Sequence, residues 1–218
     1  MDIWHSWVSL LGHGLGVLSS QLGLSEALAI VLLTLLARCL LMPLSVAAVL
    51  RGELRKERLR ALRPELDALA RRHAGDRAEL AAATMALYRT HGIRFVDRIT
   101  LANAGVQGVF GVGLFQAIGK AAYASRFLWI GNLSKPDVLL TALVSVLMLA
   151  ATAVMPGAVA EPSAALVLGA ALVVTAATLA FMPSAVGLYW AASNATGLAQ
   201  AVLVRVVLRR RRLAGAAG

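Results

Sequence analysis

The chain has 218 residues, of which 59% are hydrophobic and 15% are charged, whereas a soluble domain carries roughly 45–50% and about 25%. A soluble fold of this size could not bury so much apolar surface, and a disordered chain needs the opposite composition, so both classes are excluded. The formal net charge is +10, from 21 Lys and Arg against 11 Asp and Glu. The composition therefore predicts a basic integral membrane protein.

The charged residues are clustered along the chain. Residues 51–98 and 205–218 together hold 24 of the 32 charges. Lys and Arg beside hydrophobic spans hold a loop in the cytoplasm, which explains the basic balance by topology. A DNA-binding protein would need a soluble basic patch with elements that fit a groove. No such domain can be separated in this sequence, so we expect no DNA partner.

Residues 1–23 are the first predicted segment. Trp7, Leu11 and Leu15 recur there at helical spacing, and the segment also contains Trp4 but no Lys or Arg. Because Trp is enriched at the membrane–water boundary, we predict an N-terminal amphipathic helix that lies at the interface. A secretory signal peptide would begin with a basic region, which this segment lacks.

Five stretches then reach the roughly 17–25 residues that a transmembrane helix needs. The second and fifth contain polar residues, whereas the third and fourth are short and almost wholly apolar. The predicted fold is an all-α membrane protein, with its first span within 24–50 and a four-helix remainder within 94–208. The five stretches are Leu24–Leu50, Ile99–Gly119, Val138–Met155, Ala164–Met182 and Val186–Leu208.

A polar insert, residues 51–93, separates the first two spans. Four leucines between Leu59 and Leu69 follow a 3-4-3 spacing, and Asp76 followed by Glu79 is typical of a helix start. We predict a cytoplasmic helical hairpin whose first arm runs from Arg51 to His73. Five spans put the termini on opposite sides of the bilayer. The basic insert and the basic tail at 209–218 predict that the N-terminus is outside and the C-terminus is cytoplasmic.

Arg38 is the one charged residue deep within a hydrophobic run, as the fifteenth residue of the 27-residue first span. A charge at the bilayer centre costs about 2.5–3.5 kcal/mol on insertion scales, so it should face protein or water. One explanation is a structural Arg satisfied by a buried carboxylate or carbonyls. Apart from Glu26, about 18 Å away along the same helix, no predicted span contains an acidic residue. The sequence therefore favours a water-filled cavity around Arg38.

Polar residues also recur at helical spacing on three of the spans. Any one such stripe has a structural explanation, since polar residues in spans often bond neighbouring helices, at about 0.6 kcal/mol each. Taken together with Arg38, they predict one water-filled cavity, with Arg38, Thr34, Asn103, Gln107, Ser193 and Gln200 as its candidate lining. The stripes are Thr34, Arg38 and Ser45; Thr100, Asn103 and Gln107; and Ser193, Thr196 and Gln200.

No catalytic or metal-binding motif stands out. All four histidines lie outside the predicted spans, so an intramembrane Ser–His site would lack its base. The sequence contains no HExxH motif and no Gly-rich phosphate loop before a helix. Cys39 is the one cysteine, which excludes a disulfide framework and a CxxC metal pair. We therefore expect no cofactor, no metal and no enzymatic activity.

Further segments form a pattern that runs in order from about residue 22 to residue 208. They are Leu28–Arg38 with Met42-Pro43-Leu44, Leu62–Leu66, Met85–Ile93, Phe127–Asp137, and Gly187–Trp190 with Ser193-Asn194. In this order they resemble the YidC-type membrane insertase family in its compact form, without a large outer domain before the first span. The second span departs from the family, because Arg94–Arg98 stands where the family usually has Asn-Pro, and Gln107 alone echoes its Gln.

The resemblance implies a bacterial inner-membrane protein with five helices around a hydrophilic groove, and with Arg38 inside that groove. Members of the family insert other membrane proteins and help them fold, without nucleotide hydrolysis. The implied partners are nascent membrane proteins and the lipid bilayer. The ribosome, through the basic tail and the hairpin, and the Sec translocon are further candidate partners.

Two functions of other classes stay open. A small channel or transporter subunit could use Arg38 to attract anions. A non-inserting membrane assembly factor would be consistent with the altered second span. A broken helix pair or an inverted repeat would favour transport, and the sequence shows no repeat.

Overall fold

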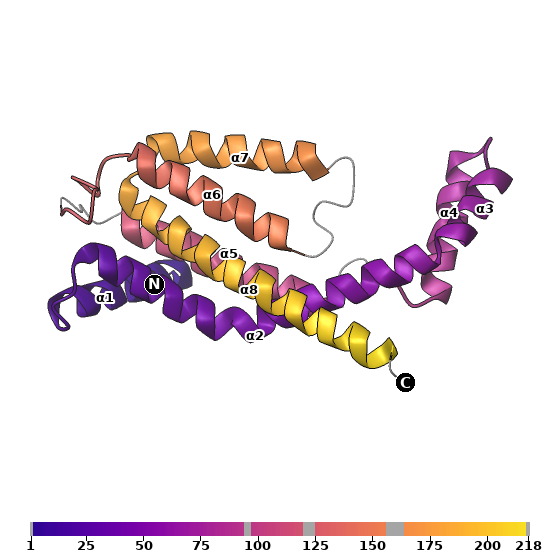
Figure 1. Ribbon diagram of the computed structural model, residues 1–218, viewed down its shortest axis with the longest axis horizontal. Coiled ribbons are helices and arrows are strands. Elements are labelled where there is room, and N and C mark those ends of the chain that lie inside the picture. The colour runs from indigo at the N-terminus through magenta and orange to yellow at the C-terminus, as the bar shows by residue number, and fades with distance from the viewer. Residues whose placement is uncertain (1, 94–96, 120–124, 156–163, 217–218) are drawn as a thin grey trace. The chain divides into compact units, whose positions relative to one another are not determined.

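The computed structural model describes residues 2–93, 97–119, 125–155 and 164–216. Contacts divide the chain into a larger unit, residues 1–43 with 106–218, and a smaller unit, residues 44–105. The described residues form eight helices and no strand beyond an isolated bridge (Figure 1). The helices are α1 (Ile3–Ser20), α2 (Glu26–Ala61), α3 (Arg63–Arg72), α4 (Arg77–Thr90), α5 (Arg98–Gly119), α6 (Val138–Val154), α7 (Ala164–Phe181) and α8 (Ser184–Ala216).

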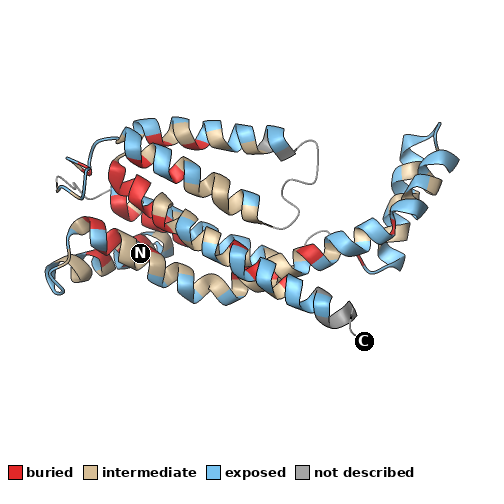
Figure 2. Cartoon of the chain, viewed as in Figure 1, coloured by how far each residue is buried: buried red, intermediate tan, exposed pale blue. Residues whose placement is uncertain are grey.

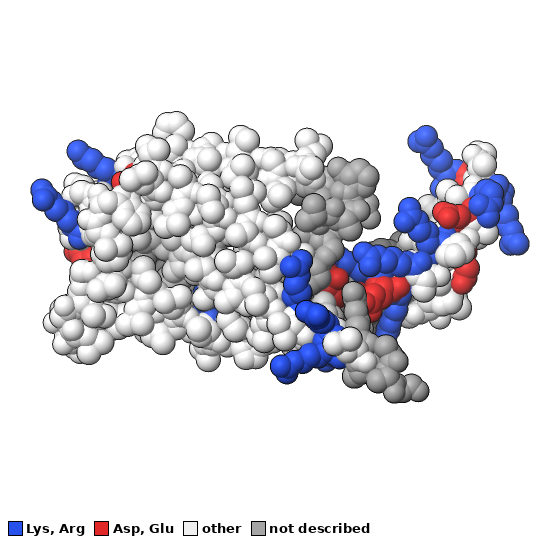
Figure 3. All heavy atoms as spheres, viewed as in Figure 1, with Lys and Arg blue, Asp and Glu red and all other residues white. Residues whose placement is uncertain are grey.

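The helices confirm the predicted all-α membrane class. By length and composition, α2, α5 and residues 184–211 of α8 can cross a membrane, while α6 and residues 168–181 of α7 are shorter apolar helices. Large apolar side chains point outward, with Leu40 80% and Phe181 85% exposed. Figure 3 shows a broad uncharged face on the larger unit, as expected for a surface against lipid. That all five helices cross the bilayer stays a prediction.

The core of the larger unit gathers toward one end of its helices (Figure 2). Buried side chains come from α1, the first turns of α2, the second half of α5, and the starts of α6 and α8, for example Ile30, Leu114 and Val144. Two more come from the α5–α6 loop, where Ile130 is 2% and Leu133 0% exposed. The helices are therefore packed tightly together at the end where this loop lies.

The α5–α6 loop also caps the start of α8. The Ser184 hydroxyl donates to the Lys135 carbonyl oxygen at 2.6 Å. The backbone N–H of Ser184 donates to the same carbonyl, and that of Ala185 donates to the Leu133 carbonyl at 3.0 Å. These bonds satisfy N–H groups that a helix start leaves without intrahelical partners. The loop thereby fixes α8 against the core.

Helix α1 packs against α5. The indole N–H of Trp4 donates to Gln116 Oε1 at 2.9 Å, and that of Trp7 donates to the Val109 carbonyl at 3.2 Å. The sequence predicted these tryptophans at the membrane boundary, but their polar atoms are engaged with α5. The location of α1 at the interface stays a prediction.

The smaller unit contains the insert. The predicted first arm, Arg51 to His73, is not one helix: α2 continues to Ala61, and α3 begins at Arg63. Pro64 explains the break, since proline has no N–H to donate to the carbonyl of Arg60 four residues earlier and its ring clashes with that carbonyl. The predicted second helix start is present, because Asp76 accepts hydrogen bonds from the backbone N–H groups of Ala78 and Glu79 at 2.8 and 3.0 Å. Helices α3 and α4 lie side by side (Figure 1).

Gly113 permits the close approach of α1 and α5. A Cβ atom at Gly113 would lie 2.5 Å from Trp7 Nε1 and 3.0 Å from a Leu11 methyl. We therefore expect Gly113→Ala to lower the free energy of unfolding by about 1–3 kcal/mol, measured by thermal unfolding of the purified protein in detergent. The matched control is Gly108→Ala on the same helix, where nothing lies within 4 Å. The control should be neutral or stabilising, and equal stability of the two variants would contradict the observed packing.

Candidate functional site

Three helices of the larger unit meet at Arg38. From α2, the Nε of this half-buried guanidinium donates to Ser193 Oγ on α8 at 3.3 Å, and a terminal nitrogen donates to Gln107 Oε1 on α5. Three of the residues predicted to line a groove, Arg38, Gln107 and Ser193, are therefore brought together. They lie far apart in the sequence.

The partners of Arg38 are neutral. In the parts of the chain that the structure describes, Arg38 forms no ion pair. A guanidinium has five N–H donors, and its two contacts here reach an amide oxygen and a hydroxyl oxygen. The partners orient the guanidinium but leave its positive charge uncompensated. The remaining donors can bind water or an incoming acceptor.

Thr34 lies one turn before Arg38 on α2 and is fully buried. Its hydroxyl donates to the Ile30 carbonyl of its own helix at 2.7 Å, and Ile30 belongs to the apolar core of the unit. Gln200 is half-exposed on α8. It lies seven residues after Ser193 and so on the same face of the helix.

Asn103 belongs to a polar pair in the smaller unit. The hydroxyl of Ser45, 2% exposed on α2, donates to Asn103 Oδ1 on α5 at 2.9 Å. The set of residues predicted to line one groove thus divides between the two units. Arg38, Thr34, Gln107, Ser193 and Gln200 lie in the larger unit, and Asn103 lies in the smaller.

Several other polar residues on or beside the predicted stripes bond within their own helix or its cap. Thr196 donates to the Ala192 carbonyl at 2.8 Å, and the side-chain amide of Asn194 donates to the Trp190 carbonyl at 2.9 Å. The Thr100 hydroxyl donates to Asp97 at the start of α5. Helical spacing alone does not distinguish these local bonds from bonds between helices.

A close approach of α5 and α8 bounds the site on the side of the core. A Cβ atom at Gly111 would lie 2.8 Å from Tyr189 Oη, and Tyr189 is 7% exposed. Gly111 follows Gln107 by one turn, and Tyr189 precedes Ser193 by one turn. Sequence reasoning did not single out this pair, although a glycine facing an aromatic side chain is typical of a close helix crossing. Within the described ranges, no three His, Cys, Asp or Glu side chains gather as a metal site would need.

Comparison with known proteins identifies the family. The sequence profile of the 60Kd inner membrane protein family matches residues 17–211. The chain belongs to this family. The match confirms the resemblance predicted from the sequence, and it makes the chain an integral membrane protein of the bacterial inner-membrane type.

Curated relatives of this chain include several proteins named membrane protein insertase YidC. One from Laribacter hongkongensis is 29% identical over 204 residues, covering 90% of this chain and 36% of the relative. One from Helicobacter pylori is 25% identical over 193 residues, covering 84% and 34%. One from an Anaeromyxobacter species is 32% identical over 111 residues, covering 50% and 19%. The chain spans about a third of the length of the first two curated relatives.

Gln107 supplies a hydrogen-bond acceptor to the guanidinium of Arg38. We expect Gln107→Leu to destabilise the larger unit by about 1–3 kcal/mol, because it removes an acceptor from a charged donor. Thermal unfolding in detergent measures the loss. Gln200→Leu is the matched control on a half-exposed site and should change stability little. A loss in the control as large as that in Gln107→Leu would contradict the assigned contact.

Proposed function

We propose that the chain inserts membrane proteins and helps them fold, with Arg38 as the electrostatic centre of a hydrophilic groove. The observation that carries the proposal is the guanidinium held by neutral oxygens of α5 and α8. A purely structural arginine in a membrane helix would be expected to pair with an acid or be fully satisfied. Membership of the family and the names of its relatives support the same function.

The physical role of Arg38 is attraction of a negative or polar flank. Two unit charges 4 Å apart interact by about 4 kcal/mol at an effective dielectric constant near 20. This attraction offsets part of the cost of bringing the acidic tail of a substrate into the membrane. A flank that enters a wet recess has less than the full ~30 Å of hydrocarbon left to cross.

The packing of the larger unit suggests a direction for the groove. The core around Ile30 and Leu114 and the contact of Gly111 with Tyr189 close the unit on one side of Arg38. A substrate flank would therefore reach Arg38 from the opposite side and stop there. Thr34 would mark the closed end, and Gln200 would extend the lining on α8. Asn103 is proposed as lining because it lies one turn before Gln107 on the same face of α5.

The proposed topology has five spans, with the N-terminus outside and the C-terminus in the cytoplasm. The smaller unit and Arg209–Arg212 would then lie on the cytoplasmic side, as the distribution of Lys and Arg predicts. Nascent membrane proteins are the proposed substrates, and the ribosome and the Sec translocon are proposed partners. Burial of the substrate's apolar segment in lipid would supply the driving force, so we expect no nucleotide hydrolysis and no enzymatic step.

Arg38→Ala should impair insertion of single-span substrates that have acidic outer tails. The expected loss is on the order of tenfold or more, because the variant removes an attraction of several kcal/mol. The measurement is insertion by reconstituted vesicles, with protease protection of the substrate tail as readout. Arg205→Ala removes an exposed arginine of α8 and is the matched control, which should insert normally.

The variant Gln107→Glu tests whether insertion needs the positive charge of Arg38 or only the contacts that Arg38 makes between helices. The new carboxylate would pair with Arg38 and neutralise it while keeping an acceptor in place, so the variant should fold but insert poorly. Normal insertion by both Arg38→Ala and Gln107→Glu would refute the groove mechanism. Selective anion conductance of the vesicles, abolished by Arg38→Ala while insertion persists, would favour a channel.

A further inference from the structure

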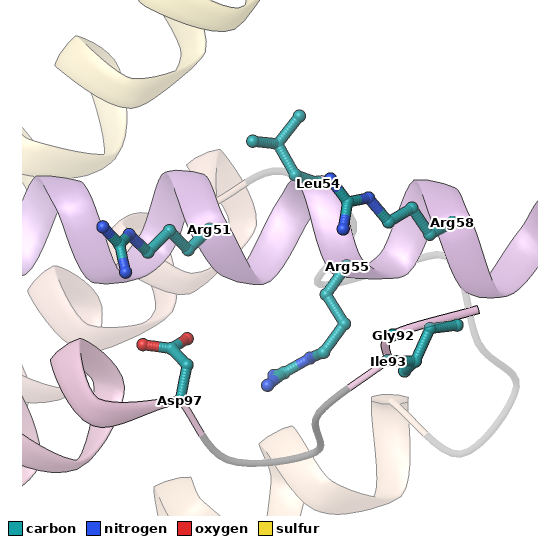
Figure 4. A pocket seen from close by; sticks show the side chains of 7 residues that line it. All are labelled: Arg51, Leu54, Arg55, Arg58, Gly92, Ile93 and Asp97. Atoms are coloured by element: carbon teal, nitrogen blue, oxygen red, sulfur yellow. The ribbon is translucent and has the colours of Figure 1, made fainter. Parts of the chain in front are cut away.

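Besides Arg38 in the larger unit, the smaller unit contains a second basic site, whose residues have no function assigned above. A pocket of about 280 Å³ is lined by side chains of α2, by the turn after α4, and by the single residue that precedes α5 (Figure 4). Arg51, Arg55 and Arg58 line it from α2, at spacings of four and three that place them on one helical face. The remaining lining residues are Leu54, Gly92, Ile93 and Asp97.

The turn after α4 is fixed by its backbone. Gly92 has φ +62°, a left-handed conformation that favours glycine. The N–H of Ile93 donates to the Tyr88 carbonyl at 2.9 Å, and that of Gly92 donates to the Arg89 carbonyl at 3.1 Å. This pair of bonds is the Schellman motif that ends many helices. One wall of the pocket is therefore held in place by hydrogen bonds.

Asp97 is the one acidic residue that lines the pocket among the described residues, and it also caps the start of α5. Its carboxylate accepts from the N–H groups of Ile99 and Thr100 at 2.8 and 2.9 Å and from the Thr100 hydroxyl. Hydrogen bonds from Thr100 and Ile99, with Arg51 nearby, hold the pKa of Asp97 below its ordinary value. The lining thus contains one carboxylate and three guanidinium groups, which gives it a net positive charge. Figure 4 shows Arg51 above Asp97 and Arg55 extending between Asp97 and Ile93.

The position of the pocket favours an amphipathic ligand. Arg51 directly follows the first predicted span, and Asp97 comes two residues before the second, so the hairpin between them returns to the same side of the bilayer. At 1.5 Å per residue, Arg51 and Arg55 lie about 1.5 and 7.5 Å beyond residue 50, near the ~5–7 Å headgroup layer. The lining also includes Leu54, 42% exposed, and Ile93. Basic and apolar groups at this depth suit a lipid headgroup joined to its acyl chains.

We propose that this pocket binds the phosphate of an anionic phospholipid, which would anchor the base of the hairpin to the membrane surface. The guanidinium groups supply the bidentate donors that phosphate oxygens prefer. Such a site would hold the ends of the first two spans at a constant depth. The pocket does not include Arg38, so lipid binding there can be tested independently of the proposed insertase function.

The test compares lipid binding by the full chain in neutral detergent. Native mass spectrometry would count bound phosphatidylglycerol and phosphatidylcholine on the wild type and on R51Q/R58Q. We expect preferential retention of phosphatidylglycerol by the wild type, and weakening on the order of tenfold in R51Q/R58Q. The matched control, R60Q/R71Q, removes two exposed arginines that do not line the pocket and should retain phosphatidylglycerol. Arg38→Ala should also retain it.

Competitors distinguish the source of the phosphate. Displacement of phosphatidylglycerol by millimolar inorganic phosphate would show a site for free phosphate and overturn the lipid assignment. Displacement by a single-stranded RNA oligomer at equal phosphate concentration would overturn it in favour of nucleic acid. Equal loss of bound phosphatidylglycerol in R51Q/R58Q and R60Q/R71Q would show that general surface charge, and not this pocket, retains the lipid, and would overturn the proposal. Persistence of phosphatidylglycerol against both competitors, with selective loss in R51Q/R58Q, supports the proposal.

Discussion

A guanidinium halfway along an apolar helix must find hydrogen-bond acceptors, because nothing in hydrocarbon can replace water. In this protein the acceptors of Arg38 come from α5 and α8, through Gln107 and Ser193. Both acceptors are neutral. They hold the guanidinium in place without cancelling its charge, and the proposed use of Arg38 depends on that residual charge.

The larger unit supports this contact by packing tightly on one side of it. The α5–α6 loop contributes Leu133 to the core, and its backbone caps the start of α8. Gly111 and Gly113 lie on the same helix and admit Tyr189 and Trp7 respectively. The helix that carries Gln107 is thus positioned by its neighbours. Polar contact and apolar packing alternate along α5, and both are needed to keep the charge at a defined place.

Much of the site was predictable from the sequence, because a charged or polar side chain within an apolar run is conspicuous. Arg38, Gln107 and Ser193 were selected on this ground, and the structure brings them together. Spacing could not reveal which polar residues bond to their own helix, as Thr34 and Thr196 do. The hydrogen bonds of the α1 tryptophans to α5 could not be predicted, because their partners lie 112 and 102 residues away in the chain. The break before α3 was missed because the leucine spacing outweighed Pro64, and the three-arginine face of α2 was read as topology alone.

The central claim, that substrate reaches the charged face of α2, can be tested by site-specific crosslinking. A photoreactive residue at Leu41 lies three positions from Arg38 on the same side of α2. One at Leu40 lies on the opposite, 80% exposed face. With stalled ribosomes that carry a single-span membrane protein, we predict crosslinks from position 41 that exceed those from position 40. We also predict that they disappear in Arg38→Ala. Equal crosslinking from both positions, unaffected by Arg38→Ala, would contradict the account.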